Sequence, residues 1–533
     1  MKLRNLYFAM AAGLAFTACS SDEPANSGNE TNGDFNYVSV RICTPGEMGS
    51  RYTDNNKDYD KGTEGESKVT NAMFVFFGAN GNISEIVKDV EFQTWKDGNG
   101  ETIDKETKAV ATLTGSSVKP VSVIAILNPP AGIEDDIRQK GSVNAVRQIL
   151  GNYTNTADGK FMMTNSAYRV GNEDIYAAKI TGEIFATKEA ALAAEENTVD
   201  IYVERVLSKV TVSKSTDFAN PSTNLEFVNG LDSKDDAVAV VPVIKGYKLT
   251  NVTGQATIVK RIDGVTQDWE WNDPANHRSY WATVPNQNVE LFNWNEISTS
   301  NPTGEFTQYP CPNNMDSSLP LQAGHTSKAT KIVVAAELQV NDKPLDLIRY
   351  LDNYYKSEED FLTRIAYEFA TAGVKWAKDE TVDDGVDHKT GTYGADDLEI
   401  VRYTDANDKV HPYKVIAKIK ASALTDKPLA DAAIYNEFVN NLRPAIEWKN
   451  GLTYYFAEIK HIGFEGQTAE LAALIRNHVY KVTLDGITGL GTPVYEPTED
   501  IDPERPTDEP DTYVSARIAL LKWRVVGQHL TLE

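Results

Sequence analysis

Residues that could hold a metal ion occur in one stretch, DNNKDYDKG, from Asp54 to Gly62. Its side-chain oxygens recur at alternate positions, as in a calcium-binding loop. Tyr59 stands where such a loop needs glycine, so the stretch does not predict a calcium site. The seven histidines are scattered, and no two share a helical face at ligand spacing, so zinc is not predicted either.

Motifs that would carry catalysis are not found in the sequence. It has no glycine-rich phosphate loop, HExxH, GxSxG or CxxC pair. Among 77 acidic residues, carboxylate pairs spaced for glycoside hydrolysis arise by chance. RNHVY, Arg476 to Tyr480, indicates a structural cluster, and the aromatic residues of DWEW, Asp268 to Trp271, could stack on sugars or pack a sandwich face. We predict no enzyme, and therefore no catalytic residue, cofactor or metal.

Composition narrows the class of protein further. A chain of 533 residues is long enough for two or more domains, and 41% hydrophobic residues can build packed cores. The net charge of −25 argues against nucleic acid and against an anionic bilayer as partners. Three cysteines, Cys19, Cys43 and Cys311, are too few for a disulfide framework.

The first residues predict an exported lipoprotein. Lys2 and Arg4 precede an apolar core from Leu6 to Phe16, which is too short to span a bilayer. The core closes on FTAC, which fits a lipobox whose cysteine, Cys19, is acylated and becomes the new N-terminus. The following SSDEPANSGNETNGD is a polar tether with almost no apolar residues. We therefore expect the precursor to carry a lipid at Cys19, as a palmitate-bearing anchor.

Strand patterns dominate the rest of the chain. FNYVSVRIC, Phe35 to Cys43, places Val38, Val40 and Ile42 on one face of a half-buried strand. Val199 to Ser213 reads as one further strand, the last of a first domain. Helices are few: one pattern runs from Ile137 to Leu150, and another begins at a capping box of Ser357 and Asp360.

These patterns predict a mostly β chain with two β-sandwich domains and a few inserted helices. The predicted boundaries are a signal peptide at 1–18, a lipidated propeptide with the first strand at 19–51, an N-terminal sandwich at 52–216, a C-terminal sandwich at 217–495, and a tether with a terminal strand at 496–533.

The end of the chain has strand character although nothing follows it. Glu496 to Asp511 holds four prolines and eight acids against one arginine, a stiff and self-repelling spacer. After it, one face of the terminal strand carries Val514, Ala516, Ile518 and Leu520, and the other carries Leu521, Trp523 and Val525. A strand whose apolar face changes at Leu520–Leu521 is bulged, bent between two neighbours, or covered on both sides.

Several pieces together resemble the fimbrillins of Bacteroides-type bacteria, the type V pilins, and most closely the minor-fimbria stalk subunits. They occur in order along the chain: the lipobox at Cys19, VSVIAILN, FMMTNSAY, VERVLSKVTV, NHRSYWA, IRNHVYKVTLDGITGLG and LLKWRVV. The ending departs from the family pattern at Leu521–Lys522, where a proline is common.

The resemblance implies two transthyretin-like β-sandwich domains and a structural role in a fimbrium on the cell surface, supporting adhesion and biofilm formation. A trypsin-like, Arg-specific protease would cut after an arginine that follows the first strand, and the terminal segment of another copy would fill the groove by donor-strand exchange. The cleavage site in this chain would be Arg51–Tyr52, in the apolar-poor loop GEMGSRYTD. Partners would be other copies of the chain, fimbrial anchor and tip subunits, and the protease.

Two alternatives remain open from the sequence. A surface glycan-binding lipoprotein would keep its lipid and its N-terminus and would have no use for a tethered terminal strand. An anchor subunit of the same fimbria would also stay lipidated and uncut, and a tip subunit would carry a further adhesive domain.

Overall fold

The structure is a computed structural model. It describes residues 37–43, 63–88, 90–96, 102–114, 118–157, 160–182, 184–194, 198–219, 222–231, 233–263, 272–273, 277–279, 281–284, 289–298, 306–314, 329–380, 387–407, 410–462, 470–501, 513–522 and 526–527. In these residues strands far outnumber helices, which confirms the mostly β prediction.

The N-terminal part is one curled sheet of nine strands. Its order is β3 (Ile83–Val87), β2 (Ala72–Gly78), β6 (Pro120–Leu127), β8 (Met163–Asn165), β12 (Val199–Arg205), β1 (Tyr37–Cys43), β5 (Thr102–Thr112) and β4 (Val90–Lys96), with β11 (Ala178–Lys179) on β6. Inward side chains from both ends of this order, such as Phe74 of β2 and Ala109 of β5, share one core cluster. The sheet therefore closes over its own core.

β2 is buried on both of its faces, which explains why its sequence, AMFVFFG, is continuously apolar rather than alternating. Phe74 and Phe76 face the interior of the curled sheet. Met73, Val75 and Phe77 face a second cluster, which includes residues of α2 (Ile133–Lys140) and α3 (Val143–Val146). The helix predicted over Ile137 to Leu150 is thus wrong in its bounds, because Gly141 in the left-handed region (φ 69°) ends α2.

The middle part is a two-layer sandwich. One sheet consists of β23 (Phe306–Gln308), β13 (Lys209–Ala219), β36 (His478–Thr488), β38 (Tyr513–Lys522) and β39 (Val526–Gly527). The other consists of β14 (Thr223–Leu225), β17 (Val238–Thr250), β24 (Lys331–Val340), β33 (Leu452–Glu458) and β37 (Thr492–Pro493), with β25 (Lys343–Pro344) on β24. Val212, Tyr247 and Tyr480 lie in the shared core.

The run predicted as one strand from Val199 to Ser213 is two strands in two different sheets. β12 pairs with β1 and β8 in the N-terminal sheet, whereas β13 pairs with β36 and β23 in the sandwich. Val206, Leu207 and Ser208 connect them, and all three are buried. The single-strand interpretation is therefore wrong, because a buried connection of this kind carries no turn signal in its sequence.

The distal part is a five-stranded sheet covered by helices. Its order is β27 (Asn353–Tyr355), β26 (Leu347–Tyr350), β32 (Ala445–Trp448), β31 (Val410–Ile419) and β30 (Leu398–Thr404). Phe361, Ile365 and Phe369 of α6 (Glu358–Thr371) pack on one face. Trp448 and Leu347 on the other face join this sheet to Leu338 of the sandwich.

The predicted start of α6 is confirmed. Ser357 caps the helix by accepting a hydrogen bond from the backbone N–H of Asp360 at 3.1 Å. Two further helices accompany it, α7 (Ala421–Asp426) and α8 (Ala432–Asn441).

The remaining described elements are short. The helices are α1 (Glu64–Ser67), α4 (Lys188–Ala193) and α5 (Trp294–Ser298). The two-stranded pairs are β9 (Tyr168–Val170) with β10 (Glu173–Ile175), β15 (Val228–Asn229) with β16 (Ser233–Lys234), β18 (Val252–Thr253) with β22 (Val289–Glu290), β7 (Leu150–Gly151) with β19 (Ala256–Thr257), β20 (Asn272–Asp273) with β21 (Arg278–Ser279), β28 (Lys375–Glu380) with β29 (Asp387–Thr392), and β34 (Lys460–Ile462) with β35 (Glu470–Ala472).

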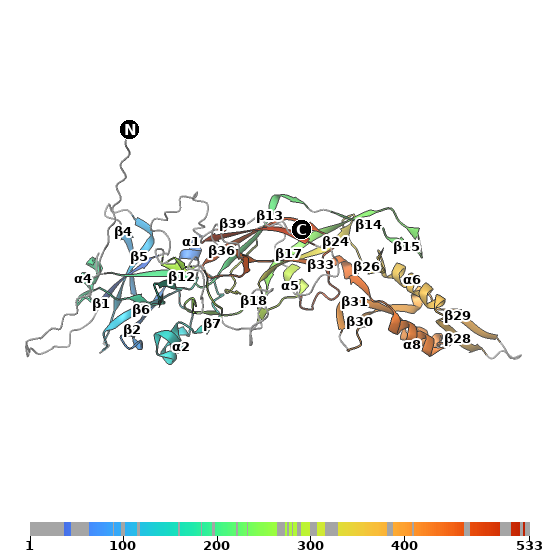
Figure 1. The fold of residues 1–533 in the computed structure, drawn as a ribbon, viewed down its shortest axis with the longest axis horizontal. Helices are drawn as coiled ribbons and strands as arrows, with labels where there is room; N and C mark the ends of the chain where they lie inside the picture. Colours follow the sequence, from blue (N-terminus) through green and yellow to red (C-terminus); the bar gives the residue numbers. More distant parts are fainter. Residues whose placement is uncertain are drawn as a thin grey trace, which may run out of the picture.

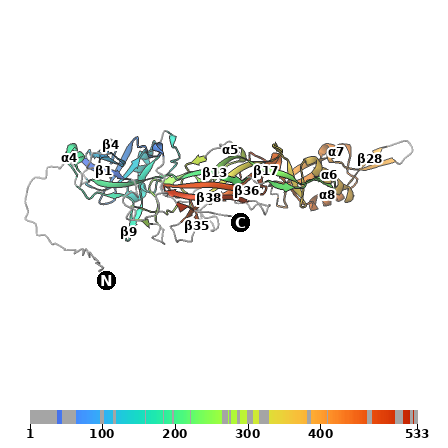
Figure 2. The same cartoon turned by 90° about the horizontal axis from the view of Figure 1, so that it is seen from above.

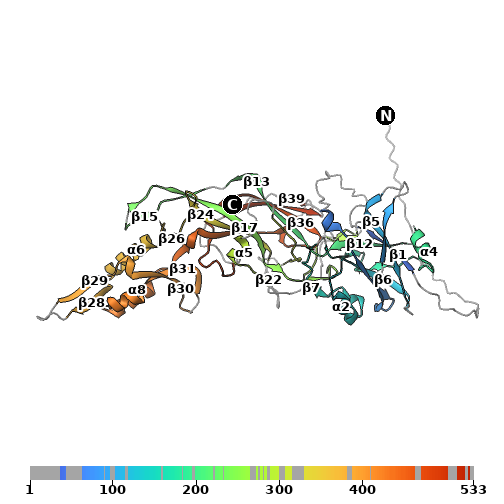
Figure 3. The same ribbon diagram turned by 180° about the vertical axis from the view of Figure 1, so that it is seen from behind.

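The three parts follow one another along an elongated molecule. β1 and α4 lie toward one end, and the hairpin β28–β29 projects at the other (Figure 1). β36 and β38 run side by side between these ends (Figure 2), and the view from behind shows the same succession (Figure 3). Among the helices described, none combines the length and apolar character needed to cross a membrane.

Candidate functional site: the first strand and the terminal strand

β1 is an interior strand of the N-terminal sheet. It pairs in parallel with β12, from Val40 opposite Val199 to Cys43 opposite Tyr202. On its other edge it pairs antiparallel with β5 over all seven residues, from Tyr37 opposite Thr112 to Cys43 opposite Glu106. Removing β1 would therefore expose the edges of two strands at once.

The inward face of β1 supplies part of the core. Val38, Val40 and Ile42 are 1%, 0% and 6% exposed and pack in the same cluster as Phe74 and Phe76. Burial of three such aliphatic side chains stabilises the fold by roughly 1.5–3 kcal/mol each before ordering costs. The alternation in the sequence correctly predicts this face.

The outward face of β1 is held by a two-point ion pair. Nε of Arg41 donates a hydrogen bond to Oδ1 of Asp200 on β12, and Nη2 of Arg41 donates one to Oδ2. Both bonds are 2.6 Å long. Next to this pair, the hydroxyls of Ser39 and Thr198 lie 3.4 Å apart. Arg41 is therefore held in the sheet by its side chain as well as by its main chain.

The start of β1 is fixed by main-chain bonds. The N–H of Tyr37 donates to the carbonyl of Phe185 at 3.0 Å, and the N–H of Phe185 donates back at 2.8 Å. Nearby, the ammonium of Lys108 on β5 donates to the carbonyls of Leu192, at 2.7 Å, and Ala194, at the end of α4. Cations are favoured at this end of a helix.

The described chain continues at Thr63, where α1 is fixed to the rest of the protein by its capping box and by Glu66. Thr63 and Glu66 form a capping box at α1, and Glu66 is 1% exposed. Its carboxylate accepts hydrogen bonds from Lys209 at 2.8 Å and from the hydroxyl of Tyr309 at 2.5 Å. Between β1 and this anchor, residues 44–62 are the only covalent connection. Arg51 and Tyr52, the predicted cleavage site, lie in this segment, and like Cys19 they are outside the described residues.

The terminal strand pairs with its own chain in this structure. β38 runs antiparallel to β36 from His478 opposite Lys522 to Thr488 opposite Tyr513. Its other edge pairs with β39 at Ala519 and Leu520. The register continues through Leu520–Leu521, so a bulge at that point is wrong; the irregularity of this pair lies on β36, between Leu484 and Gly486. Trp523 and Val525 are outside the described residues.

The first residues of the predicted spacer are attached to the folded body, at Phe292 beside the sandwich and at Arg402 of the distal sheet. Ile501 is 4% exposed, and its N–H donates to the carbonyl of Phe292 at 3.0 Å. Glu499 forms an ion pair with Arg402. The interpretation of Glu496 onward as spacer is therefore wrong up to Ile501.

The RNHVY motif is a structural cluster at the junction of the N-terminal sheet and the sandwich, as predicted. Arg476 is 2% exposed and donates to the carbonyls of Thr257 and Ile258, each at 3.1 Å. Its Nε lies 3.2 Å from the carboxylate of Glu204, which also binds the Lys260 ammonium at 2.7 Å. Burial lowers the pKa of Lys260 to about 8.

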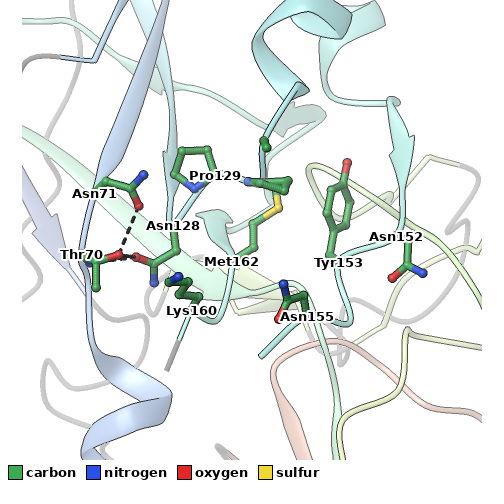
Figure 4. A pocket seen from close by; sticks show the side chains of 11 residues that line it. Thr70, Asn71, Asn128, Pro129, Asn152, Tyr153, Asn155, Lys160 and Met162 are labelled. Atoms are coloured by element: carbon green, nitrogen blue, oxygen red, sulfur yellow. Dashed lines mark hydrogen bonds between the residues drawn. The ribbon is translucent and has the colours of Figure 1, made fainter. Parts of the chain in front are cut away.

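The pockets of the described residues do not form a catalytic constellation. One pocket of about 320 Å³ is lined by Thr70, Asn71, Asn128, Tyr153 and Lys160, among others (Figure 4). Its most buried amide, Asn128, accepts two hydrogen bonds from Thr70 and donates to the carbonyls of Lys68 and Phe161, so it joins three chain segments. In the part of the chain that the structure describes, no group of histidine, cysteine or acidic side chains is arranged to hold a metal.

Two features were missed from the sequence. Asp200 was not predicted to pair with Arg41, and Glu204 was not predicted to lie in a buried charge cluster. Both partners lie more than 50 residues away, 159 for Arg41 and 56 for Lys260, so local pattern cannot reveal them. The alternation of charged and apolar residues in VDIYVER does place both acids on the same face.

Comparison with known proteins confirms the resemblance to fimbrillins at the C-terminal end. Residues 447–529, from β32 through β39, match the family model described as major fimbrial subunit protein type IV, fimbrillin, C-terminal. These residues are therefore similar to the C-terminal region of fimbrial subunit proteins. No curated protein matches the chain.

Several solved structures match this chain at low identity and low TM-score. A candidate cell adhesion protein from Parabacteroides distasonis ATCC 8503 is 10% identical, with a TM-score of 0.38 over 91% of this chain and 98% of that one. Another from Bacteroides eggerthii DSM 20697 is 10% identical, with a TM-score of 0.35 over 93% and 99%. The tip fimbrial protein Mfa3 from Porphyromonas gingivalis is 10% identical, with a TM-score of 0.31 over 91% and 99%.

Proposed function

We propose that this protein is a structural subunit of a surface fimbria that polymerises by exchange of its first strand for the terminal strand of another copy. The observation that carries the proposal is the position of β1, which fills the middle of a sheet yet is joined to the body only through residues 44–62. A cut in that segment leaves β1 bound by non-covalent contacts alone. Its loss opens a groove that a strand of matching alternation can fill.

Maturation would depend on two sites in the removed segment, the lipidated cysteine at its start and the cleavage site at its end. The precursor is lipidated at Cys19 and carried to the outer membrane, and a trypsin-like, Arg-specific protease cuts between Arg51 and Tyr52. The cut discards the lipid together with β1, so the mature subunit is released for assembly into the fimbrium. Cys43 leaves with β1, and the buried Cys311 remains as the one thiol of the mature sequence.

The terminal strand is the proposed donor. The eleven residues 502–512 separate the fixed Ile501 from Tyr513, and in an extended form they reach roughly 34 Å at about 3.1 Å per residue. Six or so large apolar side chains entering a groove gain on the order of 10–15 kcal/mol before ordering costs. Trp523 would be an anchor, because aromatic side chains contribute most to such contacts. The subunit would then have no catalysis of its own and would support adhesion and biofilm formation with the anchor and tip subunits.

The test is polymerisation of the purified precursor after limited digestion with an Arg-specific protease, because trypsin would also cut after Lys57 and Lys61 of the same segment. We expect fibres in electron micrographs and an N-terminal sequence that begins at Tyr52. A chain that lacks Val514 to Glu533 should fold and be trimmed but remain a monomer, and Trp523→Ala should give fewer or more fragile fibres. Fibres from the deletion variant, or a mature sequence that begins before Phe35, would contradict the proposal. A protein that stays lipidated and uncut on cells would instead be an anchor subunit or a glycan-binding lipoprotein.

A further inference from the structure

The terminal strand repeats the sequence of the first strand. β1 reads YVSVRIC from Tyr37 to Cys43, and β38 begins YVSARIA from Tyr513 to Ala519, so five of seven residues are identical. Alternation alone would require only apolar residues at the three inward positions. The identity extends to the outward positions, where Tyr37, Ser39 and Arg41 correspond to Tyr513, Ser515 and Arg517.

We propose that residues 513–519 of one subunit occupy the β1 groove of the next in the register of residues 37–43, and that Arg517 takes over the ion pair with Asp200. This inference rests on the proposed strand exchange and specifies its register. The occupant of the groove is a second copy of this chain.

The outward contacts are the ones that can select a register. A slip of one residue turns every apolar side chain to the wrong face, so alternation already excludes it. A slip of two residues keeps the faces correct and exchanges one aliphatic side chain for another on the inward face, whereas on the outward face it moves the charged Arg517 away from Asp200. In the register of β1 the guanidinium meets Asp200, whereas two residues away along β12 it would meet Thr198 or Tyr202.

The groove offers matching partners at the other repeated positions. Ser39 lies 3.4 Å from the hydroxyl of Thr198, so Ser515 would have the same neighbour. The bonds between Tyr37 and Phe185 are made by main-chain atoms and are available to any residue at that position. Lys108, which stands opposite Arg41 on β5, donates to the carbonyls of Leu192 and Ala194 at the end of α4.

In the described structure the same seven residues lie on β36 of their own chain, with Arg517 opposite Thr483. The two copies of the motif therefore lie in two different sheets of one molecule, one beside β12 and β5 and the other beside β36. Exchange requires β38 to leave β36 and β1 to leave its groove. The described structure is then the state before exchange, in which the β1 position and the position beside β36 are both occupied by strands of the same chain.

A charge reversal tests the pairing. The variant Arg41→Glu with Asp200→Arg keeps the ion pair of β1 in reversed order, so the precursor should fold and be trimmed as the wild type is. Its groove now opposes Arg517 with a like charge, and we expect fibre growth to slow about tenfold. Adding Arg517→Glu should restore growth. Equal growth of the double variant and the wild type, or no recovery in the triple variant, would overturn the pairing.

A disulfide tests the register directly. Ser515→Cys combined with Thr198→Cys should link neighbouring subunits into a ladder on non-reducing gels of fibres. Tyr513→Cys with Thr198→Cys, displaced by two residues, is the matched control and should give no ladder. A ladder in the control alone would overturn the register. Absence of fibres from the trimmed wild-type chain would instead refute strand exchange itself. The variants can fold whether or not strand exchange occurs, so the two outcomes can be told apart.

Discussion

Arg476 donates a hydrogen bond of 2.9 Å from Nη2 to the hydroxyl of Thr164, which lies 312 residues earlier in the chain. Thr164 is on β8 of the N-terminal sheet, and Arg476 lies two residues before the start of β36 of the sandwich. One side chain thus ties the sheet that contains the β1 groove to the strand on which β38 lies.

Replacement of Arg476 by methionine should destabilise the whole precursor. Among the described ion pairs, the change leaves the buried carboxylate of Glu204 with Lys260, and it removes the donor to the carbonyls of Thr257 and Ile258. Loss of one member of a buried charge cluster costs about 3–5 kcal/mol. Urea denaturation should show this loss in the free energy of unfolding. Arg138→Met removes an exposed pair with Glu134 and should cost less than about 0.5 kcal/mol; similar losses in the two variants would refute the assigned role.

Glu447 should make stability depend on pH around neutrality. It is 0% exposed, neither of its oxygens has a hydrogen-bond partner among the described residues, and burial raises its pKa to about 7. The charged groups near it are Lys449, which lowers this pKa, and Glu358 and Asp346, which raise it. Because the folded pKa exceeds the unfolded value, the neutral form stabilises the fold at low pH, and this contribution is lost as pH rises from about 4.5 through 7.

The substitution Glu447→Gln should remove this dependence. We expect the variant to gain about 2–3 kcal/mol relative to the wild type between pH 5 and pH 9. Thermal melts across this range are the measurement. Glu437→Gln on the exposed face of α8 is the control and should follow the wild-type profile. Parallel profiles for wild type and Glu447→Gln would contradict the prediction.

Ala516→Val should strengthen the fibres. In the proposed register Ala516 replaces Val40, which is 0% exposed, so the donor leaves a small void in the core. Two additional buried carbons contribute about 1.5 kcal/mol per subunit junction. The guanidinium concentration at which fibres dissociate should rise. Ala519→Val, at the outward position of Cys43, should have little effect, and an equal gain there would show that the inward face is misassigned.

Cys19→Ala should leave an unlipidated precursor that fails to reach the cell surface. The reason is that the proposed route to the outer membrane depends on the acyl chains at this residue. Labelling with a palmitate analogue and electron microscopy of whole cells are the measurements. Normal fimbriae on cells that carry this variant would exclude the lipoprotein route.

Local patterns predict much of the fold. The faces of β1 and the cap of α6 at Ser357 follow from alternation and from a capping box, because each depends on residues within a few positions of one another. The class of the protein follows from motifs spread along the chain, and the match at residues 447–529 confirms it for that region. The domain boundaries and the processing sites remain predictions.

Contacts between distant residues could not be predicted in the same way. The change of sheet between β12 and β13 occurs through buried Val206 and Leu207, where the apolar pattern continues without interruption. The pairing of Arg41 with Asp200 depends on the parallel register of β1 and β12, which no short-range signal specifies. The repeat of YVS and RI at the two ends is visible in the sequence, but its meaning depends on knowing that one copy lies in a groove.

The attachment of Ile501 beside Phe292 has a consequence for the spacing of subunits along a fibre. In the proposed exchange the donor would start beside α5, in the middle of the elongated molecule, rather than at the end where β28 and β29 project (Figure 1). A linker that reaches roughly 34 Å holds the receiving sheet near that midpoint. Successive subunits would therefore overlap along the fibre, with the distal helices of one beside the N-terminal sheet of the next. The axial repeat of the filament would then be shorter than the length of a single subunit.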